Sequence, residues 1–263
     1  SEEAADESGQ SGASRVIEDG AMDGVQAAIA LHITPDVANG EIAVLEGPCL
    51  AGVDSFYATI LGQGGHAAMP QTVVDPVYLA AHAIMAVQGI KSRRLHPADA
   101  AVVGVSTIHG GSAPNIVPDR VEMSGTIRFF DAAVRQQIHD ELARALQVVK
   151  ALGGDFKLRF ELGGMPVVND ATIVRVIRDV ASHLLGDEHI LTPPRPEMGS
   201  EDFSVFTNLV PGAMLWLGCQ IPGERHLLHN PTMDIDERCL PLGAALMANS
   251  ALRLLERGVV APD

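Results

Sequence analysis

The stretch between residues 54 and 164 has the apolar periodicity that most constrains the fold. Strands are predicted where β-branched and aromatic residues gather, at residues 54–61, 101–109, 119–130 and 156–162. Helices are predicted at residues 75–93 and after Asp131, where apolar residues recur three or four positions apart. The order β-α-β-β-α-β is that of a ferredoxin-like split βαβ unit. We therefore expect an α+β domain over residues 54–164.

Each predicted helix has an apolar stripe that we expect to face the core. The first stripe consists of Val77, Ala81, Ile84, Met85 and Gln88. The second begins after Asp131, which suits an N-cap, ends near Gly153, and consists of Val134, Ile138, Leu142, Leu146 and Val149.

The flanking residues 1–53 and 165–263 read as two pieces of one further domain. Before the insert we expect a helix ending at residue 19, a strand that ends at His32 and another at residues 41–45. After it we expect a helix along Ile173–Leu184, a buried strand at residues 213–217 and a last helix capped by Asp236. The predicted fold class is a layered α/β domain interrupted by the α+β insert.

Composition excludes several classes of protein. The chain has 263 residues, 47% of them hydrophobic, which is enough to bury a substantial core. The net charge of -15 argues against a nucleic-acid surface, because phosphate binding needs clustered Lys and Arg. A membrane span and a secretory leader are not expected, since long apolar runs are missing. The 3 cysteines lack a Cys-x-x-Cys pattern, so we expect reduced, packed thiols and a cytoplasmic location.

Scattered carboxylate and imidazole groups are the candidate metal ligands. Glu2 and Glu3 are adjacent, so one can bind a metal while the other acts as a base. His32 and His229 are predicted at a strand end and in a loop, the positions where α/β sheets collect ligands. Zinc, and less selectively manganese or cobalt, accepts such donors. The alternative interpretation is that the acidic run Ser1–Ser14 is a solvated tail.

Other motifs indicate different roles or none. The Gly-Gly pairs at residues 64–65 and 110–111 lack the Lys of a phosphate-binding loop, and a G-x-S-x-G serine-esterase motif is missing. Glu201 and Asp202 are expected to cap a helix start. His226 lies three residues before His229 and could share its face, but we do not assign it as a ligand.

Five ordered motifs carry a resemblance to a known family. They are Gly64–Pro70 (GGHAAMP), Ala113–Asp119 (APNIVPD), Gly125–Arg128 (GTIR), Met198–Ser204 (MGSEDFS) and Leu228–Pro231 (LHNP). The chain resembles, over essentially its whole length, the metal-dependent amidohydrolases related to aminoacylase and carboxypeptidase G. It is similar in particular to the branch of hippurate hydrolases and hydrolases of indole-acetyl amino acids.

The resemblance implies a role for each matching residue. Glu2 matches the general base, Glu3, His32 and His229 match metal ligands, His66 resembles an oxyanion-stabilising histidine contributed by a partner subunit, and Asn115 and Arg128 resemble residues that hold a substrate carboxylate. It also implies a catalytic domain at residues 1–53 and 165–263, and a lid at residues 54–164 that forms a homodimer. The expected substrate is an N-acyl amino acid or a small peptide-like amide.

The family's remaining metal ligands lie before the paired Glu and have no counterpart in residues 1–263. We therefore expect the two-metal site to be incomplete within these residues. Two alternatives to a metal-dependent amide hydrolase stay open on the sequence. One is a catalytically impaired remnant that dimerises and binds ligand, and the other is a weak esterase that needs no metal.

Overall fold

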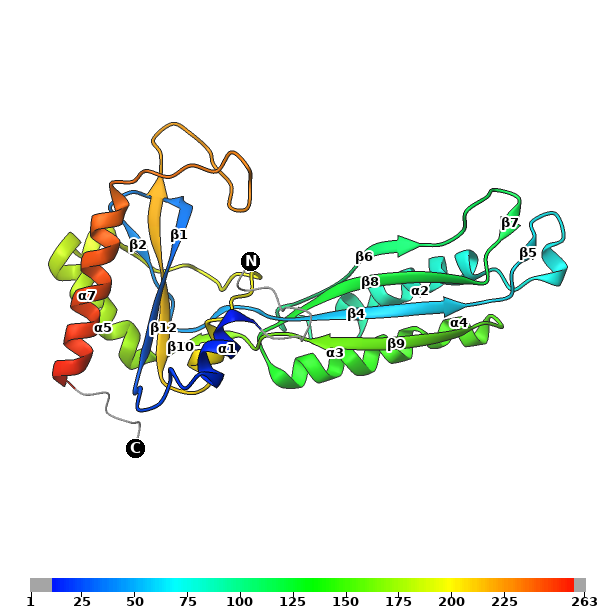
Figure 1. The fold of residues 1–263 in the computed structure, drawn as a ribbon, viewed down its shortest axis with the longest axis horizontal. Coiled ribbons are helices and arrows are strands. Elements are labelled where there is room, and N and C mark those ends of the chain that lie inside the picture. Colours follow the sequence, from blue (N-terminus) through cyan, green and yellow to red (C-terminus); the bar gives the residue numbers. More distant parts are fainter. Residues whose placement is uncertain (1–10, 258–263) are drawn as a thin grey trace. The chain divides into compact units, whose positions relative to one another are not determined.

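The computed structural model describes residues 11–257, so Glu2 and Glu3 lie outside the described residues. The chain is a mixed α/β protein with several sheets, and it forms two compact units (Figure 1). Unit 1 comprises the described residues up to Leu50 and from Val167, and unit 2 comprises Ala51–Pro166. The catalytic and lid roles expected for the corresponding parts of the sequence stay predictions.

Unit 1 is built on a four-stranded sheet with the order β1-β12-β2-β11. Strand β1 (Ala28–Ala38) is parallel to β12 (Gly212–Gln220), β12 is antiparallel to β2 (Ile42–Ala43), and β2 is parallel to β11 (Ile190–Leu191). Two further strands, β3 (Gly47–Leu50) and β10 (Val167–Asn169), form an antiparallel pair. The first described helix, α1 (Gly12–Glu18), begins after Ser11, whose hydroxyl accepts the N–H of Ser14.

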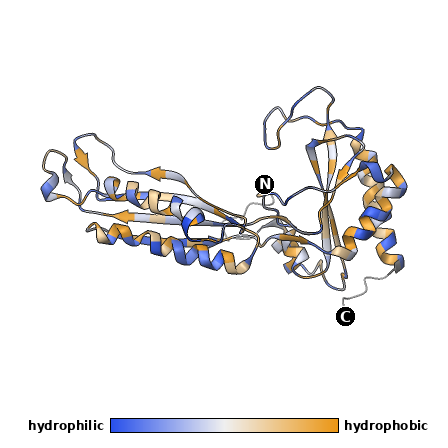
Figure 2. Ribbon diagram, turned by 180° about the vertical axis from the view of Figure 1, so that it is seen from behind, coloured by the Kyte–Doolittle hydropathy of each residue, from blue (hydrophilic) through white to orange (hydrophobic). Residues whose placement is uncertain are grey.

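The strand β12 is buried along almost its whole length because both faces of the sheet are covered. One face carries Leu215 and Leu217, which pack with α5 (Ala171–Leu185) and α7 (Cys239–Arg257). The opposite face carries Trp216, which packs with Phe203 beside α6 (Ser204–Thr207). Both α5 and α7 have hydrophobic and hydrophilic residues on different sides (Figure 2), as two helices covering a core require.

One predicted strand end in unit 1 is wrong, and one predicted cap lies in the turn just before its helix. Strand β1 continues to Ala38 instead of ending at His32. Its ladder with β12 runs to Thr34 and becomes irregular before Ala38, because Pro35 has no N–H to donate. Helix α7 begins at Cys239, and Asp236 lies in the preceding turn, where its carboxylate accepts the backbone N–H of Arg238 at 3.1 Å.

Unit 2 contains a four-stranded antiparallel sheet with the order β6-β8-β4-β9. Its strands are β4 (Gly52–Leu61), β6 (Ala101–His109), β8 (Arg120–Phe129) and β9 (Asp155–Leu162). Helices α2 (Pro76–Arg93), α3 (Ala132–Ala145) and the short α4 (Gln147–Ala151) pack on it and close one core. The predicted strands and helices of this segment are all present, with the second helix divided at Leu146.

The two apolar stripes predicted for unit 2 have different outcomes. The Asp131 carboxylate accepts the N–H groups of Ala133 and Val134, which confirms the N-cap. The α3 and α4 stripe is confirmed, since Ile138, Leu142, Leu146 and Val149 are buried. The α2 stripe is wrong except for Ile84, which packs partly buried against the core, whereas Met85 is 74% exposed. The buried residues of α2 are Pro76, Leu79, Ala80, Ala83, Val87 and Ile90. The small alanines let α2 approach the sheet with that side.

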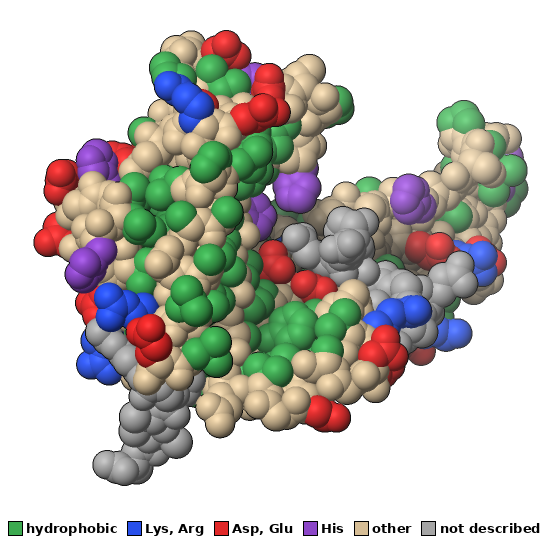
Figure 3. Space-filling model, turned by 60° about the vertical axis from the view of Figure 1, so that its left-hand side comes forward, with side chains coloured by type: hydrophobic (Ala, Val, Ile, Leu, Met, Phe, Trp, Pro, Cys, Tyr) green, Lys and Arg blue, Asp and Glu red, His purple; other side chains and the backbone are tan. Residues whose placement is uncertain are grey.

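The charged side chains, the helices and the cysteines of the described residues can be compared with what the composition predicted. On the face drawn in Figure 3, Lys and Arg side chains of the described residues are interspersed with acidic and apolar ones. Among residues 11–257, none of the helices combines the length and hydropathy needed to cross a bilayer. Cys49, Cys219 and Cys239 are buried and free, and burial raises the pKa of the Cys49 thiol to about 12.

A buried carboxylate joins the beginning of β4, the first strand of unit 2, to the residue that follows β9, its last strand. Asp54 is 0% exposed, and its carboxylate accepts hydrogen bonds from Arg135 at 2.6 and 2.8 Å, from the backbone N–H of Gly163 at 2.9 Å and from His139 Nε2 at 2.8 Å. The His139 ring also stacks on Phe160 at 4.1 Å. His139 is therefore a partnered structural histidine in unit 2.

Replacing Asp54 should destabilise unit 2 strongly. Asp54→Ala leaves the mostly buried Arg135 guanidinium without its counter-ion, and loss of one partner of a buried pair costs about 3–5 kcal/mol. We expect that decrease in the free energy of unfolding, measured by urea denaturation. Glu161→Ala, which removes an exposed carboxylate 3.3 Å from Arg159 on β9, should cost less than about 1 kcal/mol. Equal costs for the two variants would contradict the role of Asp54.

Candidate metal centre and substrate-binding residues

His32 lies on the edge strand β1, opposite Trp216 in the parallel ladder. Because side chains alternate along a strand, His32 shares the face of Ala28 and Ala30, away from α5 and α7. Its ring Nδ1 lies 2.6 Å from the carbonyl oxygen of Ile33. A carbonyl only accepts, so Nδ1 carries the proton and the neutral ring has a lone pair at Nε2. This is the arrangement in which metal-binding histidines are commonly held.

His229 lies in the loop that joins β12 to α7. It is exposed, and its φ of 59° is positive, which is uncommon for a residue other than glycine. The loop leaves the sheet where β12 ends, and β1 runs parallel to β12 (Figure 1), so both strands deliver their carboxyl ends to one edge. The topology therefore directs the chain after His32 and the His229 loop to the same edge, where α/β sheets bind ligands.

Two parts of the His229 loop are joined by the side chain of His226, to which the sequence analysis gave no role. His226 Nε2 lies 2.8 Å from a carboxylate oxygen of Glu224, and Nδ1 lies 3.1 Å from the carbonyl oxygen of Thr232. The hydrogen bond to Glu224, and then that to Thr232, raise the pKa of His226, with smaller effects of the Glu224 and Asp234 charges. Only the spacing of His226 and His229 hinted at a connection, and it did not reveal these partners.

The described residues alone do not assemble the predicted metal centre. Within residues 11–257, no three His, Cys, Asp or Glu side chains gather closely enough to hold a metal ion. Glu2 and Glu3 lie outside that range, so their predicted roles are untested. His32 suits zinc because Nδ1 is bonded to the Ile33 carbonyl and Nε2 keeps a lone pair, and exposed His229 offers a second imidazole.

The Met198–Ser204 motif contacts α1, the first helix of the described residues. Asp202 accepts the backbone N–H of Ala13 at 2.9 Å, in the first turn of α1. Glu201 accepts the N–H of Phe203 at 3.3 Å, while α6 has no side-chain cap. Helix capping was expected here, but Asp202 caps the distant α1 instead of the helix that follows it.

His66 and Asn115 come together at one end of unit 2. The two-residue strands β5 (Gly65–His66) and β7 (Ile116–Val117) pair, and the Asn115 carbonyl accepts the N–H of Ala67 at 3.1 Å. Gly64 permits this approach, since a Cβ there would lie 2.7 Å from the carbonyl oxygen of Val117. His66 Nδ1 accepts the N–H of Ala68 at 3.1 Å, so the neutral ring carries its proton on Nε2.

Arg128 lies on β8, at the end of the four-stranded sheet that is away from the β5-β7 pair and His66. It pairs with Val53, whereas Leu61 pairs with Arg120 at the end of the sheet next to β5 and β7, which we call the His66 tip. The Arg128–Val53 pair and the Arg120–Leu61 pair are eight residues apart along the antiparallel strands, which corresponds to about 27 Å. The structure therefore does not bring Arg128 together with Asn115 in one chain, although both match residues that hold a carboxylate. Partial burial lowers the pKa of the Arg128 guanidinium, which still stays protonated at neutral pH.

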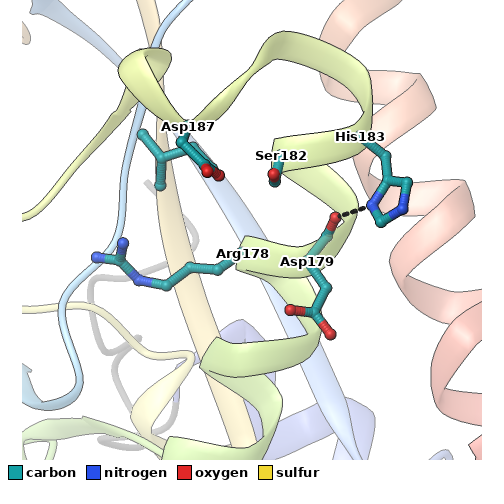
Figure 4. Close-up of a pocket in the computed structure, with 6 residues that line it drawn as sticks. Arg178, Asp179, Ser182, His183 and Asp187 are labelled. Atoms are coloured by element: carbon teal, nitrogen blue, oxygen red, sulfur yellow. Dashed lines mark hydrogen bonds between the residues drawn. The ribbon is translucent and has the colours of Figure 1, made fainter.

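A separate cavity of about 310 Å³ lies beside α5 in unit 1 (Figure 4). Its lining includes Arg178, Ser182, His183 and Asp187, and none of the predicted site residues. The Arg178 guanidinium donates to the Val44 carbonyl and the Thr192 hydroxyl, and His183 Nδ1 lies 2.6 Å from the Asp179 carbonyl oxygen. The Arg178 bonds join α5 to neighbouring segments, whereas the His183 bond lies within α5, and neither identifies a ligand.

Comparison with known proteins identifies the family. The sequence model of Peptidase family M20/M25/M40 matches residues 2–253. The chain belongs to this family. It is 37% identical over 253 residues to the N-acetyl-L-cysteine deacetylase of Bacillus subtilis, covering 96% of this chain and 59% of that protein. It is 35% identical over 256 residues to the IAA-amino acid hydrolase ILR1-like 4 of Arabidopsis thaliana, covering 95% and 58%.

Solved structures share the fold. The YXEP protein of Bacillus subtilis, named as a dinuclear metal binding peptidase of the M20 family, matches with a TM-score of 0.76 and 28% identity, over 93% of this chain and 61% of that one. A putative aminohydrolase from methicillin resistant Staphylococcus aureus matches with a TM-score of 0.85 and 24% identity, over 96% and 65%. The chain thus spans about three fifths of the length of these relatives.

Proposed function

We propose that this protein is a metal-dependent hydrolase of N-acyl amino acids or small peptide-like amides. Family membership and the names of the relatives, a deacetylase of N-acetyl-L-cysteine and a hydrolase of IAA-amino acids, support this substrate class. The observation that carries the proposal is the His32 Nδ1 bond to the Ile33 carbonyl, which keeps Nε2 as a ligand atom on β1, the strand that runs parallel to β12 toward the start of the His229 loop.

Glu3, His32 and His229 would hold a divalent metal such as zinc, manganese or cobalt. Imidazole and carboxylate donors suit these ions. When bound, such an ion lowers the pKa of a water molecule to about 7 and polarises a carbonyl group. Further ligands would come from outside residues 1–263, as the partial coverage of the relatives allows.

The remaining roles belong to groups of this chain. Glu2 would take a proton from the attacking water. His66, whose neutral ring has its proton on Nε2, would donate a hydrogen bond to the oxyanion that forms when an amide is attacked. Arg128 would bind the substrate carboxylate through two hydrogen bonds of its planar guanidinium, and Asn115 would add an amide donor.

The length of unit 2 supports assigning His66 to a partner subunit. His66 and Asn115 lie beyond the Arg120 end of the four-stranded sheet, and Arg128 lies about 27 Å from Arg120 along the strand direction, toward the other end. One small substrate cannot contact both ends of one sheet. In a two-fold dimer, Arg128 of one subunit and the His66 tip of the other can serve the same substrate.

We also propose that unit 2 is a ferredoxin-like lid that forms the dimer. Numbered along the β-α-β-β-α-β order, its four long strands lie in the order second, third, first, fourth, and all neighbours are antiparallel. The outer side of α2 exposes Tyr78 (54%) and Met85 (74%), and the adjacent edge strand β6 exposes Ile108. An uncovered edge of nine residues beside an apolar helix face favours pairing with a second copy.

Replacing the proposed base should abolish amide hydrolysis. In the complete gene product loaded with zinc, Glu2→Gln keeps the size of the side chain but cannot take a proton, so we expect the kcat for N-acetyl amino acids to fall at least about 100-fold. Circular dichroism and zinc content should stay unchanged. Unchanged kcat in Glu2→Gln, or wild-type activity that survives chelation, would contradict the proposal.

A charge on the outer side of α2 should dissociate the dimer. We expect the wild-type protein to be a dimer at micromolar concentration and Met85→Glu to be a monomer, because a carboxylate would be buried without a partner in the interface. Analytical ultracentrifugation measures both. The control Leu255→Glu places the same charge on an exposed position of α7 (81% exposed) and should leave the dimer intact. A monomeric wild type would refute the lid interface.

A further inference from the structure

The loop from β12 to α7 is closed by the side chain of His226. The ring spans from Glu224, two residues before it, to Thr232, six residues after it, so its two hydrogen bonds bracket His229. A carboxylate and a carbonyl can only accept, so both hydrogen bonds form when both ring nitrogens carry protons. Both nitrogens are thereby occupied, and in this arrangement His226 cannot itself ligate a metal.

A second set of hydrogen bonds continues the closure on the other side of His229. The Asn230 side-chain oxygen accepts the backbone N–H of Thr232 at 3.0 Å and its hydroxyl at 2.8 Å. The N–H of Met233 donates to the Asn230 carbonyl at 3.0 Å. His229, with a φ of 59°, thus occupies a disfavoured left-handed conformation inside a turn whose two sides are joined through His226 and Thr232.

We propose that His226 is a positioning residue, which holds the turn of residues 224–232 so that His229 is presented to the metal. The inference rests on the proposed function, because it takes His229 as a ligand. The loop is exposed and has few buried apolar contacts, so hydrogen bonds must supply its order. A preordered ligand binds a metal more tightly, because less conformational entropy is lost when the metal arrives.

The test replaces His226 in the complete gene product. His226→Phe keeps a planar ring and removes both donors, whereas His226→Asn keeps one donor that reaches toward the Thr232 carbonyl. We expect zinc to bind about 10–100-fold more weakly to His226→Phe, and the amides of residues 226–233 to exchange faster with solvent. His226→Asn should recover part of both effects. The control His183→Phe removes an exposed histidine of α5 and should change neither quantity.

A second background separates positioning from general destabilisation. In His229→Ala protein, whose zinc affinity is already lower, adding His226→Phe should produce no further loss. A further loss of the same size would overturn the proposal, as would unchanged zinc affinity or unchanged exchange in His226→Phe alone. Those outcomes leave the proposed function standing. A wild-type protein that binds no zinc would instead refute the proposed function, and the positioning role with it.

Discussion

The parallel ladder between β1 and β12 is the constraint on which the candidate metal centre depends. It joins segments about 180 residues apart in sequence, places His32 opposite Trp216, and sends both strands to one edge of the sheet. Burial of the apolar side chains on both faces of β12 stabilises this pairing, because α5 and α7 cover one face and the cluster around Phe203 covers the other. The His229 loop can then begin at the edge that β1 also reaches.

The length of unit 2 determines how far apart its candidate substrate-binding residues lie. In its antiparallel sheet about 27 Å separate Arg128 from Arg120, at the end next to the β5-β7 pair that carries His66. The buried Asp54 network joins the beginning of β4 to the residue after β9. Chemical groups at the two ends of such a long element can reach one small substrate only when two copies are combined. The separation of these groups is therefore a physical reason for the proposed dimer.

The sequence predicted most of the secondary structure because its periodicities are strong. Strand β6 has the predicted bounds, and Asp131 caps α3 as its position before an apolar stripe indicated. The packing side of α2 could not be predicted, since apolar residues occur on two of its sides and only the sheet selects one. The end of β1 was misplaced because Pro35 is tolerated on an edge strand. The His226 bonds arise only when the loop folds, so the sequence could not reveal them.

The central claim is that His32 and His229 bind the metal, with His32 held by its Nδ1 bond to Ile33. Nitrogen-15 NMR of the complete gene product with labelled histidine, titrated with zinc, tests it most directly. Assignment uses His32→Gln and His229→Gln variants. The account predicts that zinc shifts a ring nitrogen of each residue, with Nε2 the shifted atom in His32, while His226 keeps both protons. Unshifted His32 and His229 nitrogens at saturating zinc would contradict it.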